Sequence, residues 1–169
     1  MKAALLVFAL ATVAWAQNPN TFPSSCGPGT NFKVKLESPP ATPVLPAAGK
    51  AEVVFIHDVG GGPFTGLFAY PTSRYAIDGA WSGANHGSSW FAVSVEPGEH
   101  HVCTNLQTSV VDELTELAHF TAVAGKTYYF RTRLIMSRQV ELLDLEPIDT
   151  DQGDYLTKIY SLSVATPKK

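Results

Sequence analysis

Short runs of β-branched and aromatic residues alternate with breaks that contain proline or glycine between Ser88 and Leu134. Such runs are typical of β-strands, and the breaks are typical of tight turns. We therefore expect this stretch to form a meander of antiparallel strands, at residues 90–95, 100–104, 119–123 and 127–134.

Runs outside this stretch predict strands in different environments. Residues 32–36 alternate apolar side chains with lysines, which indicates a half-exposed edge strand. Residues 52–57 are apolar at nearly every position, which indicates a central strand covered on both faces. We also expect a strand at 73–79, a turn at 83–87, and a last strand at 140–145 that ends before Pro147.

One short helix is predicted near the C-terminus. Asp149 is a good N-cap, and Gln152 follows three residues later, which is the spacing of a capping box. Gly153 lowers the stability of such a helix by about 1 kcal/mol. We expect the helix to cover residues 150–160, with three apolar side chains on one side, at Tyr155, Leu156 and Ile159.

The number and spacing of these elements indicate an all-β protein. We predict a single-domain β-sandwich of the immunoglobulin-like, Greek-key type with one short C-terminal helix, and a small closed barrel is the alternative. The expected organisation is an export signal at 1–16, a proline-rich arm with an edge strand at 17–50, and the sandwich domain at 51–169. Folding of such a domain requires no cofactor.

Three motifs within this domain resemble those of the DUF2846 family. They are VEPGEH at 95–100, AGKTYYF at 124–130 and IDG at 77–79, and the similarity extends over residues 51–160. The resemblance implies a small β domain in a secreted or envelope protein of bacteria, with no assigned activity. The motifs are strands and turns, so no catalytic or binding residue is implied by them.

The N-terminus has the pattern of a signal peptide. Lys2 supplies a positive charge, residues 3–15 form an apolar core, and small residues at 14 and 16 match a cleavage site. The core is shorter than the roughly 20 residues of a transmembrane helix. We expect cleavage after Ala16 and export to the periplasm or the outside of the cell; a buried N-terminal helix is the alternative.

The charge of the chain argues against two classes of partner. The chain has 12 basic and 15 acidic side chains and a formal net charge of -3. A nucleic-acid partner would require a basic face, and anionic lipid would attract a basic cluster. We therefore expect neither partner, and no membrane span after cleavage. The oligomeric state is left open.

The two cysteines, Cys26 and Cys103, are expected to form a disulfide in an oxidising compartment. On the chain-entropy model, closing so long a loop stabilises a fold by roughly 4.5 kcal/mol. The bond would pin the proline-rich arm to a strand. Free thiols and a catalytic cysteine are the alternatives, although the chain has no Cys-x-x-Cys spacing.

A histidine pair is the sharpest candidate for metal binding. If a hairpin is centred near Val110, His101 lies opposite His119. Such cross-strand residues have Cβ atoms about 5 Å apart, close enough for two imidazoles to share Zn²⁺ or Cu²⁺. His57 is a third candidate ligand that the pattern does not place.

A recognition surface is predicted in two places. The glycine-rich segment 58–72 carries three aromatic residues, which form either a small satellite core or an exposed patch of the kind that marks interaction sites: Phe64, Phe68 and Tyr70. Arg131 and Arg133 share a strand face with Tyr129 and form either a solvated face or a set of binding hot spots.

No catalytic residue is predicted. The chain lacks a Gly-x-Ser-x-Gly elbow and a His-Glu-x-x-His motif, and Lys126 lies in a turn and not in a phosphate-binding loop. The sequence therefore predicts a non-catalytic, exported binding or structural module of the bacterial envelope. Its partner is unknown, and an envelope protein or a glycan is the candidate. The alternative is a metal-binding protein or metal-dependent enzyme that uses His101 and His119.

Overall fold

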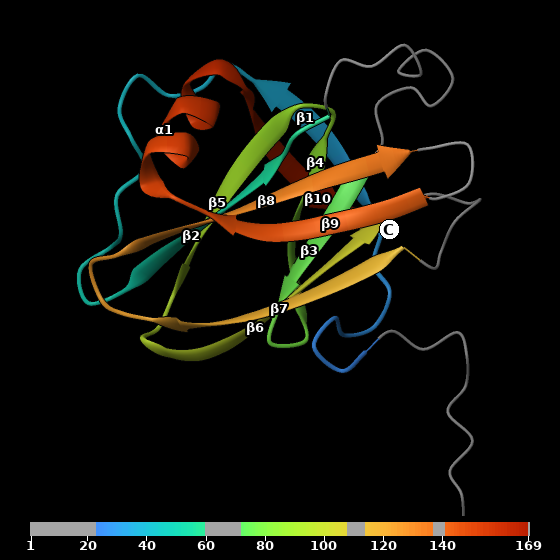
Figure 1. Ribbon diagram of the computed structural model, residues 1–169, viewed down its shortest axis with the longest axis horizontal. Helices are drawn as coiled ribbons and strands as arrows, with labels where there is room; N and C mark the ends of the chain where they lie inside the picture. Colours follow the sequence, from blue (N-terminus) through green and yellow to red (C-terminus); the bar gives the residue numbers. More distant parts are fainter. Residues whose placement is uncertain (1–22, 60–71, 108–113, 137–140, 169) are drawn as a thin grey trace, which may run out of the picture.

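A computed structural model describes residues 23–59, 72–107, 114–136 and 141–168 (Figure 1). These residues form ten strands and one helix. The elements in chain order are β1 (Phe32–Glu37), β2 (Ala51–His57), β3 (Thr72–Ile77), β4 (Ala80–His86), β5 (Ser89–Val95), β6 (Gly98–Leu106), β7 (Thr115–Ala122), β8 (Thr127–Met136), β9 (Glu141–Ile148), α1 (Thr150–Ile159) and β10 (Ser161–Pro167).

The strands form two sheets that pack face to face. The larger sheet has the order β1-β10-β5-β2-β8-β9, and the smaller has the order β4-β3-β6-β7. Aromatic and branched side chains fill the space between them, with Phe55 stacked on Tyr75 at a centroid distance of 4.8 Å. The predicted all-β sandwich with one short helix near the C-terminus is confirmed.

Strand β2 is the centre of the larger sheet, between β5 and β8. All seven of its residues are buried. Val53 and Phe55 face the smaller sheet, whereas Val54 and Ile56 pack beneath α1. The apolar side chains on both faces of β2 are therefore covered, as the apolar run at residues 52–57 predicted. Strand β1 lies at the edge of the same sheet, as its lysines predicted.

The predicted antiparallel meander is wrong in its pairing. Strands β5 and β8 belong to the larger sheet, β6 and β7 belong to the smaller one, and only β6 and β7 pair directly. The chain passes from one sheet to the other at two glycines with positive φ, Gly98 at 141° at the start of β6 and Gly125 at 79° in the turn before β8. Two pairings are parallel, β2 with β8 and β10 with β5.

Three local predictions at the ends of elements also need correction. Residues 83–86, expected in a turn, lie in β4, because they pair with β3. Gly83 packs there on the Phe91 ring, where a Cβ would approach to 2.6 Å. Strand β9 continues through Pro147, which an edge strand tolerates. It is not the last strand, since β10 follows α1.

Helix α1 begins as predicted. The Asp149 carboxylate accepts a hydrogen bond from the Gln152 N–H at 2.8 Å. Leu156 is buried against the larger sheet, whereas Tyr155 and Ile159 are exposed, so only part of the expected apolar side is used. None of the helices among the described residues is both long and apolar enough to cross a bilayer.

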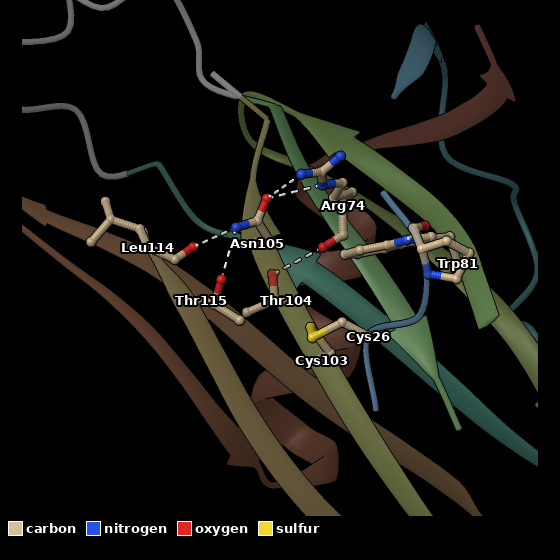
Figure 2. The surroundings of a disulfide bond; sticks show 9 residues. Cys26, Arg74, Trp81, Cys103, Thr104, Asn105, Leu114 and Thr115 are labelled. Atoms are coloured by element: carbon tan, nitrogen blue, oxygen red, sulfur yellow. Dashed lines mark hydrogen bonds between the residues drawn. A yellow bond between two sulfur atoms is a disulfide. The ribbon is translucent and has the colours of Figure 1, made fainter. Parts of the chain in front are cut away.

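The N-terminal arm lies on the outer face of the smaller sheet and is pinned there as predicted. A disulfide joins Cys26 in the arm to Cys103 in β6, with Cα atoms 5.1 Å apart. Figure 2 shows Arg74 beside this bond, where it donates two hydrogen bonds to the Asn105 side chain. The Arg74 guanidinium also lies 4.8 Å from the centre of the Trp81 ring.

Candidate functional site

The edge strands β7 and β9 approach each other on one side of the sandwich (Figure 1). An open groove lies at this place. Its volume is about 350 Å³. Residues from β7, β8, β9 and the start of α1 line it: Ala118, His119, Phe120, Thr127, Tyr128, Tyr129, Phe130, Pro147, Ile148, Asp149 and Thr150. The groove therefore joins both sheets and the helix N-terminus.

This groove is large enough to hold a ligand, whereas a second hollow lined by described residues is not. Ligand sites occupy roughly 300–1,000 Å³. The second hollow, between residues 40–44 and α1, measures about 50 Å³. That volume holds only one or two water molecules at about 30 Å³ each.

Aromatic rings form the wall of the groove. The Phe120 ring lies 4.9 Å from the Tyr128 ring and 5.3 Å from the Phe130 ring. Pairs of this geometry add about 0.5–1.5 kcal/mol each to the stability gained from burial. The Tyr128 hydroxyl accepts a hydrogen bond from the Val123 N–H at 3.0 Å, which fixes the ring further. The wall is therefore preformed.

The charged groups near the groove are acidic. Glu116 is on the same side of β7 as Ala118 and Phe120, because side chains alternate along a strand. It is half-buried, and no cation among the described residues pairs with it. Asp149 lines the groove and caps α1. Among the described residues, no lysine or arginine lines the groove, so its chemistry favours apolar groups and positive charge.

The predicted histidine pair exists. His101 lies opposite His119 in the β6–β7 hairpin, both are exposed, and their ring centroids are 6.5 Å apart. With Zn–N bonds of about 2.0–2.1 Å, two rings on one ion have centroids roughly 6 Å apart or less. Within the described residues, no group of three or more histidine, cysteine or acidic side chains is placed to hold a metal.

His57 does not join this pair. It is fully buried in β2, and its Nε2 lies 3.5 Å from the Ser73 hydroxyl. Burial, together with the nearby His86, lowers the pKa of His57 to about 3. The imidazole is therefore neutral at ordinary pH and inaccessible from the surface on which His101 lies.

A second histidine contact was missed at the sequence level. The Nδ1 of His100 lies 2.6 Å from the Asp78 carboxylate, and its Nε2 lies 2.7 Å from the Glu96 carbonyl oxygen. Both partners only accept hydrogen bonds, so this geometry suits the doubly protonated imidazolium. Asp78 also accepts from the His101 N–H at 2.8 Å. The sequence contains the pair Asp78-Gly79, which is typical of a turn. It does not show that this turn contacts β6.

These contacts shift the pKa values of both partners. Burial by itself lowers the pKa of His100, but the Glu96 carbonyl and the Asp78 carboxylate outweigh it, and the pKa is raised. Burial by itself raises the pKa of Asp78, but the hydrogen bonds from His101 and His100 outweigh it, and the pKa is lowered. The contact is therefore an ion pair at mildly acidic pH.

Arg131 and Arg133 share the outer face of β8 with Tyr129, as predicted, but both are engaged in ion pairs. Arg131 contacts Glu146 and lies 3.8 Å from Asp58. Arg133 lies 2.9 Å from Asp144 and 3.1 Å from Glu146. The hydrogen bond to Asp144 is the main cause of a raised Arg133 pKa. Their use in recognition stays a prediction, and it would compete with these carboxylates.

The three predicted aromatic contact residues, Phe64, Phe68 and Tyr70, lie outside the described residues. The groove aromatics on β7 and β8 were not singled out from the sequence, because the strand pattern made them ordinary core residues. Only the meeting of two sheet edges shows that part of this apolar surface is open.

Comparison with protein-family models, with curated proteins and with solved structures finds no match to this chain. The resemblance to the DUF2846 family therefore stays a prediction.

Proposed function

We propose that this protein is an exported, non-catalytic binding module that holds its ligand in the groove between β7 and the β8–β9 pair. The observation that supports this proposal is the preformed, aromatic wall of a groove of about 350 Å³. Ligand sites are concave, largely apolar and formed before the ligand arrives. The partner would be an envelope protein or a glycan of the compartment to which the chain is exported.

Export is supported by two independent features. The first is the signal-peptide pattern of residues 1–16. The second is the Cys26–Cys103 bond, because disulfides persist in oxidising compartments. The resemblance to a family of bacterial secreted and envelope proteins points to the same compartment.

A binding role is favoured over turnover by the way the polar groups of the groove are used. The Tyr128 hydroxyl accepts from the Val123 backbone, and the Asp149 carboxylate caps α1. Both groups hold the groove in shape. A general base or nucleophile would instead be held by a second side chain that activates it.

Filling the groove tests the proposal. Ala118→Phe places a ring in the groove, whereas Leu117→Phe places the same ring on the opposite, exposed side of β7. We expect Ala118→Phe to weaken ligand binding about tenfold or more and Leu117→Phe to leave it within about twofold. Binding is measured by NMR titration of the exported form with envelope peptides and glycan fragments.

Two results would contradict the proposal. One is that every ligand that binds changes chemical shifts only at residues outside β7, β8 and β9. The other is equal binding by the two phenylalanine variants, since their side chains point to opposite faces of one strand. Thermal unfolding of both variants shows whether either change disturbs the fold.

A second candidate function is metal binding by His101 and His119, and one observation favours it: the two residues are directly opposite in the β6–β7 hairpin. Elemental analysis of the purified protein tests it. Stoichiometric zinc or copper that is lost in His119→Ala would support a metal protein. Protein without bound metal that also fails to take up zinc or copper in titration would exclude it.

A further inference from the structure

The groove lies beside a sheet edge, β7, whose protection against strand pairing is limited to one inward-facing charge, Glu116. Sheet edges are normally guarded by lysines, prolines, inward charges or bulges. Strand β1 carries two lysines, β9 carries a proline and acids, and β4 has a shift in its pairing with β3. Strand β7 has eight residues in unbroken register with β6, and Glu116 is its only formally charged residue apart from a histidine.

One side of β7 pairs with none of the described strands, and the backbone groups on that side follow from its pairing with β6. The Leu106 N–H donates to the Leu114 carbonyl, in register with the β6–β7 pairs. Hydrogen-bonded and non-hydrogen-bonded pairs alternate along an antiparallel ladder. Every second residue of β7 therefore directs its N–H and C=O away from β6 and outward: Thr115, Leu117, His119 and Thr121.

The chemistry next to this edge specifies an occupant. Side chains of an added strand alternate between the groove and solvent. The groove offers the apolar surface of Phe120 and Tyr128, and the half-buried Glu116 lies two residues from Ala118 on the same side of β7. An added strand therefore needs apolar side chains at every second position and one positive charge opposite Glu116.

We infer that β7 binds an extended basic–apolar peptide as an added strand, with its apolar side chains in the groove and a lysine or arginine at Glu116. This inference rests on the proposed binding function and names its ligand class. Strand addition combines main-chain hydrogen bonds, which give affinity, with pockets for alternate side chains, which give specificity. A second copy of this chain fits less well, because β7 offers no lysine or arginine to the Glu116 of its partner.

The probe is a panel of end-blocked octapeptides with valine at alternate positions, threonine between them, and one lysine moved along the chain. Binding to the exported form is measured by titration calorimetry. We expect at least one lysine register to bind. Its glutamate counterpart should bind about tenfold more weakly, as should a version with N-methylated amides that cannot pair with β7.

Two substitutions in β7 locate the site. Leu117→Pro removes an outward N–H and keeps the β6 ladder, whereas Leu117→Val keeps that N–H. We expect about a tenfold loss of peptide affinity in Leu117→Pro and less than a twofold change in Leu117→Val. Glu116→Gln should abolish the preference for the lysine peptide over the glutamate peptide.

The outcomes distinguish this inference from the proposed function. If a ligand fails to bind the Ala118→Phe variant but binds the Leu117→Pro variant normally, the groove is the ligand site and strand addition is wrong. If no peptide of the panel binds at millimolar concentration, the inference is overturned whatever else the groove holds. Self-association of the unaltered protein that Leu117→Pro abolishes would assign the edge to a second copy instead. Should Leu117→Pro fail to fold, the N-methylated peptides decide: equal binding with and without methylation overturns strand addition.

Discussion

The two outer faces of the sandwich are covered in different ways. Over the larger sheet, α1 buries apolar surface: Leu156 packs with Trp90 and Tyr129. The Trp90 indole also donates hydrogen bonds to carbonyl oxygens at the end of α1, at 3.0 and 3.2 Å. This cover is an amphipathic helix held mainly by the hydrophobic effect.

Over the smaller sheet, the cover is an irregular arm with few apolar side chains. Residues 23–31 hold one buried apolar residue, Cys26, and it is bonded covalently to β6. Polar contacts supply the rest: Arg74 donates to the Thr30 carbonyl at 2.8 Å, and Trp81 donates to the Pro28 carbonyl at 2.5 Å. A segment too polar to be held by burial is thus held by a covalent bond and by hydrogen bonds to a buried arginine.

Among changes to the two covers, removal of the disulfide should lower the free energy of unfolding most. We expect Cys26→Ser combined with Cys103→Ser to lower the free energy of unfolding by roughly 4.5 kcal/mol, because a loop spanning 77 residues in sequence loses its constraint. Urea unfolding measures this loss. Trp81 reports on the arm side and Trp90 on the helix side, in variants that keep one of the two. Unfolding of both tryptophans at an unchanged urea midpoint would contradict the prediction.

Loss of the buried arginine should have the next largest effect. Arg74→Met keeps the aliphatic stem but leaves Asn105 and the Thr30 carbonyl without these donors. Since a buried polar group without its partner costs about 1–3 kcal/mol, we expect destabilisation by about 2 kcal/mol. The matched control is Arg133→Met on the other sheet, where a partly exposed ion pair contributes at most about 1 kcal/mol. Equal losses in thermal or urea unfolding would show that the two arginines are equivalent.

On the helix side, Gly153→Ala should be destabilising although alanine favours helices. The added Cβ would lie 2.3 Å from the Tyr129 ring, which is held by a hydrogen bond from its hydroxyl to Asp154 at 2.6 Å. Overpacking costs about 1–3 kcal/mol, and helix propensity returns about 1 kcal/mol. We expect a net loss of about 1 kcal/mol, compared with less than about 0.5 kcal/mol for the exposed Lys158→Ala. A stabilised Gly153→Ala variant would mean that the helix moves freely away from the sheet.

The smallest effect is expected at the Asp78–His100 contact on the arm side, and it should depend on pH. The raised pKa of His100 gives stability that is full below the unfolded value of about 6.5 and is lost as pH rises through the folded pKa. The lowered pKa of Asp78 gives stability that is full above about 3.8 and is lost as pH falls through its folded pKa. Stability should therefore be greatest between about pH 4 and 6.5 and fall by less than about 1 kcal/mol toward pH 8.5.

Urea unfolding across this pH range measures the effect. His100→Gln should flatten the decline between pH 6.5 and 8.5, whereas the exposed neighbour His101→Gln should retain it. An identical decline in the unaltered protein and in His100→Gln would assign the pH dependence to another group.

Several elements were predictable because their signals are local. The Asp149 cap, the lysine alternation of β1 and the doubly apolar β2 each appear within a few residues of sequence, and the structure confirms all three. The His101–His119 pairing was also predictable, since a hairpin fixes its own register once its centre is known. Strand β10 was missed because its small and polar residues give a weak alternation that only its two neighbouring strands stabilise.

The candidate site was predictable only in part. The arginine face of β8 was identified, but its carboxylate partners come from β9 and from Asp58, which the strand pattern does not bring together. Phe120 and Tyr128 looked like ordinary core residues in the sequence. They belong to different sheets, and the strand pattern does not show that these sheets meet at an edge. The predicted aromatic patch of residues 64–70 lies outside the described residues.

The sequence by itself determined the all-β class, the capped helix, the disulfide partners and a mildly acidic charge, because composition, periodicity and cysteine count are properties of the chain alone. Only the tertiary structure decided which strands share a sheet, which edge is left open and which charges meet. Those outcomes depend on contacts between residues far apart in sequence, and their energies are absent from any local window.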